Sequence, residues 1–416
     1  MQRRFTPVAW STTSNMYEVN VRQYTPEGTF NAFARHLPRL RDMGIETLWF
    51  MPITPISQEK RQGTLGSYYA CSDYKAINPE FGTLADFKAL VNKAHSMGFK
   101  VIMDWVANHT GYDHIWTKTH PEYYKKNAEG KFYDTNNWHD VIDLNYYDHG
   151  LRAAMIDAMA YWVKECDIDG FRCDMCHLVP LDFWQKARTT LDAIKPLFWL
   201  GETQDVAYLS VFDCMYGWRW MSATEKFARH EAGLQQLYDV LNHYESDCPP
   251  GTFPLLFTSN HDENTWNGTE FEKYGSLSKP LAVFSCTWNC MPLIYTGQEL
   301  PLHKRLPFFD KDHIEWKEKP ELHSFYKTLL ELRKAHPALQ TGVPPRIIPI
   351  ESNIPVMAFH RQQGEREVLV ILNFSGNDAT IQVPVNGHFT NLFTNQLVAM
   401  PGAMAITGYQ YFVLVK

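Results

Sequence analysis

Short apolar runs alternate with amphipathic stretches from Tyr17 to about Ala338. The runs are rich in β-branched and aromatic residues and have the length of buried parallel strands. Only a short helix fits before the sixth of them. Eight strands are predicted: YEVNV (17–21), ETLWFM (46–51), KVIMDWV (100–106), GFRCD (170–174), FWLGE (198–202), VFDCMY (211–216), LLFTS (255–259) and PLIYTGQE (292–299).

Helical periodicity occupies several of the intervals between these strands. The predicted helices cover residues 30–43, 84–98, 151–165, 180–195 and 321–336. Gly44 and Gly98 stand where the first two patterns stop, which is typical of helix C-termini. Strands that alternate regularly with helices indicate an α/β protein, and eight such units predict a (β/α)8 TIM barrel.

Two segments depart from this alternation. Residues 110–149, after the third strand, are rich in Asn, Asp, Tyr and Trp and have no long periodic run, so they are predicted to be an insertion. After Pro337 the pattern changes to period two, at 357–361, 367–375, 379–385 and 410–416, which predicts an antiparallel β-sandwich. The predicted domains are therefore a barrel over 1–109 and 150–338, an inserted domain over 110–149, and a β domain over 339–416.

Four polar side chains end or closely follow predicted strands: His109, Asp174, Glu202 and Asp262. A carboxylate at the end of a buried strand has no packing role. In a (β/α)8 barrel the carboxyl ends of the strands form the face where active sites are built. One such Asp alone is more often a turn or a helix cap, but several acids in the same register favour a shared site.

Carboxyl groups that converge in this way cannot all ionise at their ordinary pKa. One would stay protonated near neutral pH and act as a general acid, while another stays ionised and acts as a nucleophile. Arg172 precedes Asp174 by two residues, so both side chains face the same side of the strand, and the guanidinium would keep Asp174 ionised. His109 and His261 offer donors for hydroxyl groups, and the set matches the parts of a glycosidase.

The chain resembles the α-amylase family, glycoside hydrolase family 13, over nearly its whole length. The resemblance rests on DWVANHT (104–110), GFRCD, the GE that follows FWL, SNHD (259–262), VIDLN (141–145), GSYYACSDY (66–74) and YTGQE (295–299). It implies a retaining hydrolysis of α-glucosidic bonds, with the insertion as domain B and the C-terminal domain as domain C. It assigns Asp174 as the nucleophile, Glu202 as the acid/base, and Asp262 as the group that holds the 2- and 3-hydroxyls.

The same resemblance assigns a second set of residues to the substrate. It implies that Tyr69 stacks on the sugar and that Arg172, His109 and His261 bind it at the cleaved bond. Asp104 would contact Arg172 or Tyr69. His177 and Leu178 stand where many α-amylases have Lys-His, so His177 belongs to the predicted substrate-binding set, whereas the usual Lys-His contact is not predicted.

A calcium ion is the one cofactor that the resemblance suggests, and no organic cofactor is predicted. Asn108 matches a calcium ligand of many amylases, but Ca²⁺ needs six or more oxygens. Asp113, Asp134, Asp140 and Asp143 could supply them or could simply be solvated. The sequence does not decide between calcium ligands and solvated carboxylates.

The leading prediction is hydrolysis of α-1,4 bonds in starch-derived glucans and maltooligosaccharides. A short insertion predicts an open groove and therefore endo cleavage. An α-glucosidase, a cyclomaltodextrinase or neopullulanase, and a glucanotransferase would use the same acids, so linkage, chain length and transglycosylation stay open. A catalytically inactive glucan-binding protein is the alternative of another class, and the presence of all three acids disfavours it.

Composition adds limits to this interpretation. With 45% hydrophobic residues, a net charge of −7 and no long basic run, the chain is not typical of proteins that bind nucleic acid or anionic membranes. Aromatic residues make up 14% and favour a carbohydrate ligand. The eight cysteines, including Cys173 and Cys176 of a CxxC, are interpreted as buried and reduced, which favours the cytoplasm. The periplasm or secretion are the alternatives if a signal peptide was removed, and the oligomeric state stays open.

Overall fold

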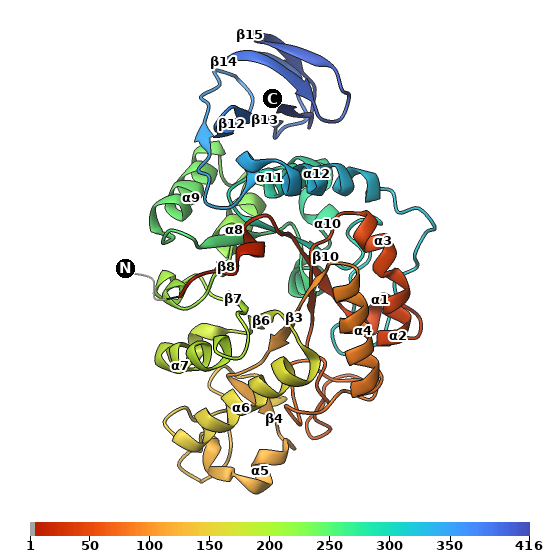
Figure 1. Cartoon of the computed structure of the whole chain (residues 1–416), viewed down its shortest axis with the longest axis vertical. Coiled ribbons are helices and arrows are strands. Elements are labelled where there is room, and N and C mark those ends of the chain that lie inside the picture. Colours follow the sequence, from red (N-terminus) through yellow and green to blue (C-terminus); the bar gives the residue numbers. More distant parts are fainter. Residues whose placement is uncertain (1–4) are drawn as a thin grey trace.

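Eight parallel strands close into a barrel at the centre of the molecule (Figure 1). The computed structural model describes residues 5–416, so the first four residues of the predicted barrel domain lie outside the described residues. The strands follow the order β1-β10-β9-β8-β7-β6-β3-β2 around the barrel. Their bounds are β1 Met16–Val19, β2 Thr47–Phe50, β3 Lys100–Trp105, β6 Gly170–Cys173, β7 Phe198–Gly201, β8 Cys214–Tyr216, β9 Phe253–Leu256 and β10 Met291–Tyr295. The prediction of a (β/α)8 barrel is confirmed.

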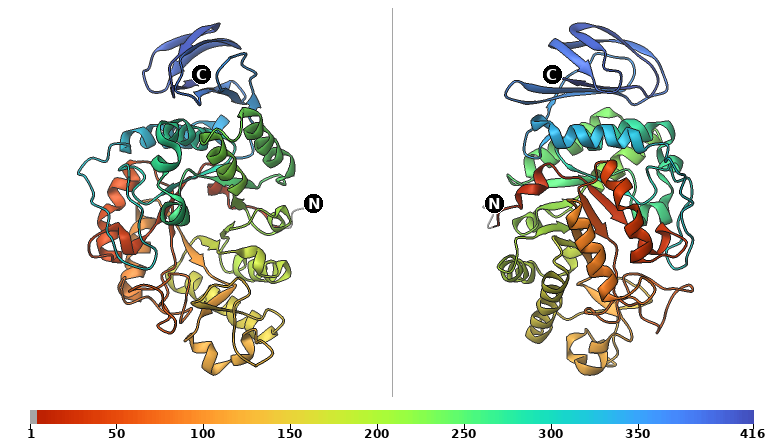
Figure 2. Two further views of the ribbon diagram at one scale, coloured as in Figure 1. Left: turned by 180° about the vertical axis from the view of Figure 1, so that it is seen from behind. Right: turned by 45° about the vertical axis from the view of Figure 1, so that its right-hand side comes forward.

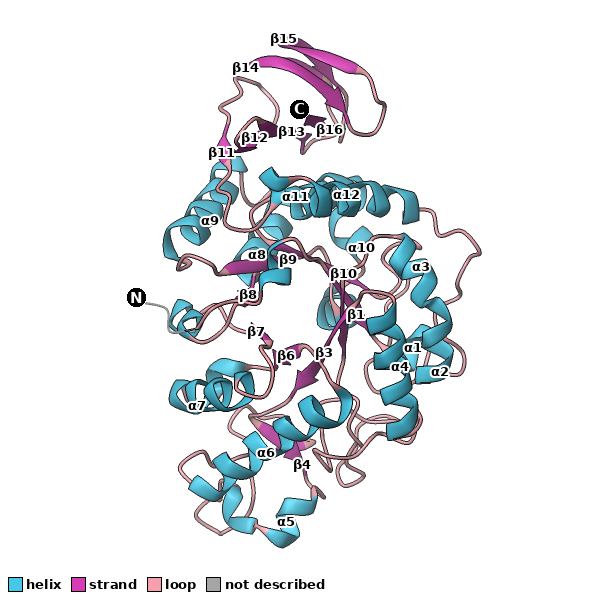
Figure 3. Cartoon of the chain, in the orientation of Figure 1, coloured by secondary structure: helices cyan, strands magenta, loops and turns pink. Residues whose placement is uncertain are grey.

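Helices surround this barrel (Figure 3). Those of the barrel domain are α1 Val21–Tyr24, α2 Phe30–Phe33, α3 Leu37–Asp42, α4 Leu84–Ser96, α6 His149–Cys166, α7 Leu181–Asp192, α8 Trp218–Ala228, α9 Leu234–Asp247, α10 Glu270–Tyr274, α11 Ser278–Thr287 and α12 His323–Ala335. Local sequence explains their ends. Thr83 and Asp86 form a reciprocal capping box at the start of α4, and Gly98 adopts φ 83° just beyond its end.

One predicted helix is interrupted. The segment 30–43 forms α2, a short 3-10 turn over Ala34–His36, and then α3. Pro38 lies in the first turn of α3, where its missing N–H costs nothing, whereas inside a continuous helix it would remove a hydrogen bond. The proline therefore divides the amphipathic pattern into two helices.

The inserted segment begins and ends on a short antiparallel ladder. Strands β4 (His109–Gly111) and β5 (Val141–Asp143) pair so that His109 lies opposite Asp143. Between them lie α5 (Ile115–Thr119) and a 3-10 turn over Pro121–Tyr123. The ladder holds the start of the insertion, next to the end of β3, against its end.

The C-terminal residues form a six-stranded antiparallel sheet in the order β11-β12-β13-β16-β14-β15. Its strands are β11 Arg346–Ile347, β12 Val356–Gln363, β13 Arg366–Asn373, β14 Ala379–Asn391, β15 Leu397–Ile406 and β16 Tyr411–Val415. Both views of Figure 2 place this sheet at the opposite end of the molecule from the insertion. The predicted antiparallel C-terminal domain is confirmed, and the domain boundaries drawn from the sequence stay a prediction.

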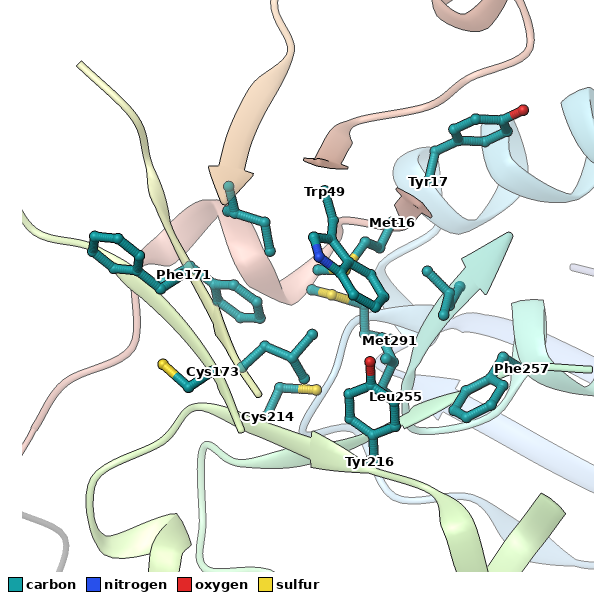
Figure 4. Close-up of a cluster of buried hydrophobic side chains, with 14 of the residues drawn as sticks. Met16, Tyr17, Trp49, Phe171, Cys173, Cys214, Tyr216, Leu255, Phe257 and Met291 are labelled. Atoms are coloured by element: carbon teal, nitrogen blue, oxygen red, sulfur yellow. The ribbon is translucent and has the colours of Figure 1, made fainter. Parts of the chain in front are cut away.

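The barrel interior is filled in two levels. Apolar side chains at the amino ends of the strands, which include Met16 of β1 and Met291 of β10, occupy the lower level (Figure 4). Nearer the carboxyl ends of the strands stand the buried polar side chains of Glu18, Asp104, Arg172 and Tyr216. Because residues two apart on a strand face the same side, Glu18 points to the same side as Met16. The lower level supports the polar residues from beneath.

Two further features bear on the predictions. None of the described helices combines the length and the apolar character that crossing a membrane requires. All eight cysteines are free thiols and seven of them are buried, Cys173 and Cys176 included.

Candidate active site

The carboxyl ends of the barrel strands surround one cavity of about 370 Å³. Asp174 directly follows β6, Glu202 directly follows β7, and Asp262 lies in the loop after β9. Among the predicted site residues, those that line the cavity are Tyr69, His109, Asp174, Glu202, His261 and Asp262. The fold therefore brings together side chains from five separate segments of the chain.

Arg172 lies beneath this cavity and links three carboxyl groups. Its Nη1 donates to Asp174 Oδ1 at 2.8 Å and to Asp104 Oδ1 at 2.9 Å. Its Nη2 lies 2.7 Å from Glu202 Oε2, an ion-pair distance without the alignment of a hydrogen bond. The guanidinium is fully buried, and Nε donates to the hydroxyl of Tyr216 at 3.1 Å. One rigid cation thus fixes the positions of both predicted catalytic carboxyls.

Glu202 receives a second constraint from the backbone. The N–H of Met175 donates to Glu202 Oε2 at 2.9 Å. Met175 adopts φ 38°, a left-handed conformation that costs a non-glycine residue free energy. The strained turn after Asp174 therefore aims a backbone donor at Glu202.

Burial determines the protonation of the acids. It raises the pKa of Glu202, and Arg172 only partly opposes this. Burial also raises the pKa of Asp174, against the lowering effect of Arg172. For Asp104, which lies deeper, burial raises the pKa to about 7, again against Arg172. A buried carboxyl that retains its proton near neutral pH can act as a general acid.

His261 is held on both of its ring nitrogens. Nδ1 contacts Glu18 Oε1 at 2.5 Å, and Nε2 lies 2.8 Å from the hydroxyl of Tyr69 and 3.3 Å from Asp262 Oδ2. Burial opposes protonation of the ring, but Asp262 and Glu18 outweigh it and raise the pKa of His261 to about 9. The imidazole is therefore a cation at neutral pH.

Tyr69 and Asp104 connect the carboxyl groups around Arg172 with His261. The Tyr69 hydroxyl donates to Asp104 Oδ2 at 3.1 Å, and its ring is nearly parallel to His261, 18° apart at 5.4 Å between centroids. Asp104 therefore contacts both of the groups, Arg172 and Tyr69, that the family resemblance offered as alternatives.

His109 differs from His261 in charge. Burial lowers its pKa to about 4, so the ring is neutral. Asn108 Nδ2 lies 3.2 Å from His109 Nδ1, and the ring of Trp138 packs edge-on against it at 5.2 Å. A neutral imidazole that lines the cavity can donate one hydrogen bond and accept another.

His177 lies away from the cavity lining. Its side chain is exposed, and Nδ1 is 3.4 Å from the backbone oxygen of Glu202. The structure thus places His177 beside Glu202 rather than among the lining residues, and its contact with substrate stays a prediction.

The groups suggested for calcium have other partners. Asp143 Oδ2 is 2.8 Å from the ammonium of Lys125, and Asp134 Oδ2 accepts from two backbone amides, those of Asn136 and Trp138, at 2.6 and 2.9 Å. Among the described residues no group of three or more His, Cys, Asp or Glu side chains is placed to hold a metal ion. These side chains do not fit a calcium cage, because a lysine takes the cationic position beside Asp143. The calcium prediction stays untested.

Several lining residues were not predicted to belong to the site, although Asp140 was named as a possible calcium ligand. They are Gln62, Ser67, Asn137, Trp138, His139, Asp140, Val141, Met175, Trp266, Phe308 and Phe309. Glu18 was not predicted either, although an acid inside the apolar run YEVNV was a usable signal. Phe308 and Phe309 carried a weaker one, an aromatic pair among the charged residues of KRLPFFDKDH (304–313), after the last barrel strand.

The family comparison covers most of the barrel. The family model described as "Alpha amylase, catalytic domain" matches residues 7–141 and 123–305. Among solved structures, that of an alpha-amylase from Lactobacillus plantarum is 28% identical, with a TM-score of 0.89, and covers 97% of this chain and 99% of that one. That of a noncanonic maltogenic alpha-amylase from Thermotoga neapolitana is 30% identical, with a TM-score of 0.90, and covers 97% and 98%.

Curated relatives are longer than this chain. An alpha-amylase from Haloarcula japonica is 27% identical over 425 residues, which cover 95% of this chain. The chain spans only 60% of the length of that relative. A cyclomaltodextrinase from Geobacillus thermopakistaniensis is 25% identical over 89% of this chain, which spans 67% of that protein.

Proposed function

Since the chain belongs to the alpha-amylase family, we propose that it is a retaining glycoside hydrolase that cleaves α-1,4-glucosidic bonds of starch-derived glucans and maltooligosaccharides. The observation that carries the proposal is the pair of carboxyls, Asp174 and Glu202, held on the single guanidinium of Arg172 at the base of one cavity. The names of the relatives support a glucan-hydrolysing activity.

The first step needs an acid and a nucleophile. Glu202, whose pKa burial raises, donates its proton to the glycosidic oxygen. Asp174 attacks the anomeric carbon, and the bond to the leaving sugar breaks as the bond to the carboxylate forms. Two carboxyls anchored on one guanidinium favour the separation of about 5–5.5 Å that retaining enzymes use.

In the second step Glu202 acts as a base and water acts as the nucleophile. Glu202, now ionised, takes a proton from a water molecule, which attacks the anomeric carbon and releases Asp174. The sugar leaves with its original anomeric configuration. Arg172 supports the ionised forms of both acids, because its charge lowers the pKa of each carboxyl.

The remaining cavity residues position the sugar. Asp262 is more open to the cavity than Asp174 or Glu202 and accepts hydrogen bonds from the 2- and 3-hydroxyls. The neutral His109 supplies a donor to the same ring. The cationic His261, whose two ring nitrogens face Glu18 and Tyr69, holds Asp262 in place from 3.3 Å, and its own contact with the sugar stays a prediction. The face of Tyr69 stacks against the apolar side of the sugar.

An activity of the cyclomaltodextrinase type is the second candidate, and relatives with that name favour it. Both activities use the same acids, so the substrate decides between them. The endo cleavage suggested by the short insertion, and the cytoplasmic location suggested by the cysteines, stay predictions.

Product analysis tests the proposal. The purified protein is incubated with amylose, β-cyclodextrin, pullulan and maltose, and products are separated by chain length. We expect cleavage of amylose, with the α-anomer formed first by proton NMR. A first-formed β-anomer would exclude the retaining mechanism, and no cleavage of any of the four would favour the inactive glucan-binding protein. Loss of terminal glucose alone would refute endo action.

A further inference from the structure

Two exposed tryptophans line the catalytic cavity. Trp266 is 53% exposed and Trp138 is 36% exposed. Large rings that stay open to water, and that line a cavity, mark binding surfaces rather than packing. Trp138 packs against His109, whereas the mechanism proposed above gives Trp266 no role.

Trp266 belongs to a series of rings that leads to the sugar-binding residues. Its centroid lies 5.5 Å from that of Phe308. Phe308 in turn lies 6.1 Å from Tyr69, with the two rings only 14° from parallel. Tyr69 is nearly parallel to His261. The rings therefore extend the apolar surface of Tyr69 outwards from the cleaved bond.

Hydrogen bonds between loops fix this surface. The hydroxyl of Thr265 donates to the carbonyl of Leu306 at 2.7 Å, and the N–H of Leu306 donates to Asn264 Oδ1 at 2.8 Å. Gln23 Nε2 donates to the carbonyl of Pro307 at 2.8 Å. The loops after β9 and β10 thus hold Trp266 and Phe308 in place before any ligand binds, which reduces the entropy lost on binding.

The direction of the surface follows from the roles of the acids. Glu202 protonates the leaving group, so the leaving part of the glucan lies on the side of Glu202. The ring contacts of Phe308 instead include Tyr69 and His261, which surround the retained sugar. The surface therefore continues towards the non-reducing end of the glucan.

We propose that Trp266 and Phe308 bind the glucosyl unit that precedes the cleaved one on the non-reducing side. Aromatic faces stack on the C–H faces of a pyranose ring and bind the sugar without depending on its hydroxyl orientation. The protein then favours bonds that leave at least two glucosyl units on that side over bonds that leave one. This inference rests on the proposed function and adds to it the choice of bond.

The test uses p-nitrophenyl α-maltoside, which has two bonds that the protein can cleave. Cleavage of the aryl bond leaves two glucosyl units on the non-reducing side and releases maltose and p-nitrophenol. Cleavage between the glucoses leaves one unit and releases glucose and p-nitrophenyl α-glucoside. Chromatography of the products gives the ratio of the two cleavages, which does not depend on how much active protein is present.

The wild-type protein should cleave mainly the aryl bond. Trp266→Ala and Phe308→Ala should each lower the ratio of aryl to inter-glucose cleavage by about tenfold, whereas Trp266→Phe should keep it within about twofold. Tyr147→Ala is the matched control, because Tyr147 is an aromatic residue that is 94% exposed and does not line the cavity. Its ratio should equal that of the wild type.

The outcomes separate the two proposals. An unchanged ratio in both Trp266→Ala and Phe308→Ala would overturn the inference while leaving the hydrolase intact. A wild-type protein that cleaves mainly between the glucoses would also overturn it. If the wild type cleaved neither bond of this substrate and also left amylose intact, the proposed function itself would fail. If it cleaved amylose alone, maltotetraose labelled at its reducing end would replace the aryl substrate. The ratio of labelled maltose to labelled maltotriose then compares the bond that leaves two glucosyl units on the non-reducing side with the bond that leaves one, with the same expectations.

Discussion

The Nδ1 atom of His261 lies 2.5 Å from Oε1 of Glu18, although 243 residues separate them in the chain. Both side chains are buried. The second carboxylate oxygen of Glu18, Oε2, has no hydrogen-bond partner in the part of the chain that the structure describes. Glu18 thus directs its one bond to His261, which itself contacts Tyr69 and Asp262. We interpret Glu18 as a positioning residue that keeps the imidazole charged and oriented.

Glu18→Gln should change how stability depends on pH. The folded-state pKa of His261 is about 9, above its ordinary value of about 6.5. The stabilisation from the bound proton is therefore complete below about pH 6.5 and is lost as pH rises to about 9. The glutamine removes one of the charges that raise this pKa, so the variant should lose less unfolding free energy across that window. Each unit of pKa corresponds to about 1.4 kcal/mol.

Urea unfolding at pH 6.5, 7.5 and 9 measures this dependence. Glu165→Gln serves as the control, because Glu165 is an exposed partner of Lys88 and is remote from the site. Equal slopes for Glu18→Gln and the wild type would show that Glu18 does not set the charge of His261.

The roles of the two catalytic acids can be separated by the leaving group. Glu202→Gln should lose at least about 10²-fold in kcat on maltotriose, because the leaving sugar needs a proton. On 2,4-dinitrophenyl α-maltoside, whose leaving group departs as an anion, it should retain most of kcat/KM and release dinitrophenolate in a burst, because only the second step still needs Glu202 as a base. Asp174→Asn should lose about 10⁴-fold or more on both substrates, because the covalent path disappears.

Measurements of glucan binding and of a control variant accompany these kinetic comparisons. Asp174→Asn should still bind maltotriose in calorimetry, and Asp157→Asn, an exposed change on α6, should behave as wild type on both substrates. Equal losses of kcat/KM of Glu202→Gln on the two substrates would contradict its assignment as the acid.

Arg172→Lys should move the acidic limb of the pH profile. Arg172 lowers the pKa of Asp174, in opposition to burial. An ammonium cannot bond Asp104, Asp174 and Glu202 in the geometry of the guanidinium, so the pKa of Asp174 should rise. The nucleophile would then be protonated up to a higher pH, and the acidic limb of kcat/KM should shift upwards. A variant with lower kcat and an unmoved acidic limb would show that Arg172 only orients the acids.

The sequence was sufficient to predict the site residues that lie on strands or at strand ends. The alternation of side chains on a strand placed Arg172 beside Asp174, and strand ends placed Glu202 on the same face. It missed Glu18, because an acid in a short strand has no recognisable partner until the barrel closes and brings β9 near β1. Phe308 lies in a long loop without periodicity, so only the closed fold shows that it contacts Tyr69.

For the fold as well, some elements could be predicted from the sequence and others were missed. Short apolar runs identified the eight strands, because burial on both faces leaves consecutive apolar residues. The brief β8 had the weakest support among them, since only a short helix fits before it. Helices α8 and α9 were not predicted, although both have a buried side. The buried residues of α9, Leu237, Leu241 and Tyr244, recur at helical spacing, so the sequence carried a usable signal there that was missed.

Lys125 offers a test of the calcium prediction. Its ammonium lies 2.8 Å from Asp143 Oδ2, which also accepts from the hydroxyl of Thr135 at 2.6 Å. Because this cation neutralises the buried Asp143, treatment with EDTA should leave the thermal midpoint unchanged, and added Ca²⁺ should not raise it. Lys125→Met should lower the midpoint by several degrees, since it leaves Asp143 without its ion pair. A midpoint that falls with EDTA and recovers with Ca²⁺ would instead establish a metal site.

Arg361 should stabilise the packing of the C-terminal sheet against the barrel. From β12 its fully buried guanidinium donates to the carbonyl of Trp288 at 2.9 Å and to those of Gln340 and Val343 at 2.6 Å each. Arg361→Met would leave these buried acceptors unpaired, at a cost of about 1–3 kcal/mol for each one that water does not reach. Arg366→Met, an exposed change on the neighbouring strand β13, should alter the unfolding free energy by less than about 0.5 kcal/mol.

The two arginine variants are compared by urea unfolding, followed through tryptophan fluorescence and by residual hydrolysis of amylose. Trp288 belongs to the barrel domain and packs against Phe359 of the sheet at 4.9 Å between ring centroids. In Arg361→Met this contact should therefore break, and Trp288 should become exposed to water, at a lower urea concentration than in the wild type. The fluorescence transition should then precede the loss of hydrolysis, since the catalytic acids lie at the carboxyl ends of the barrel strands. Coincident transitions at the wild-type urea concentration would show that the carbonyls find other donors and that Arg361 is not needed at this junction.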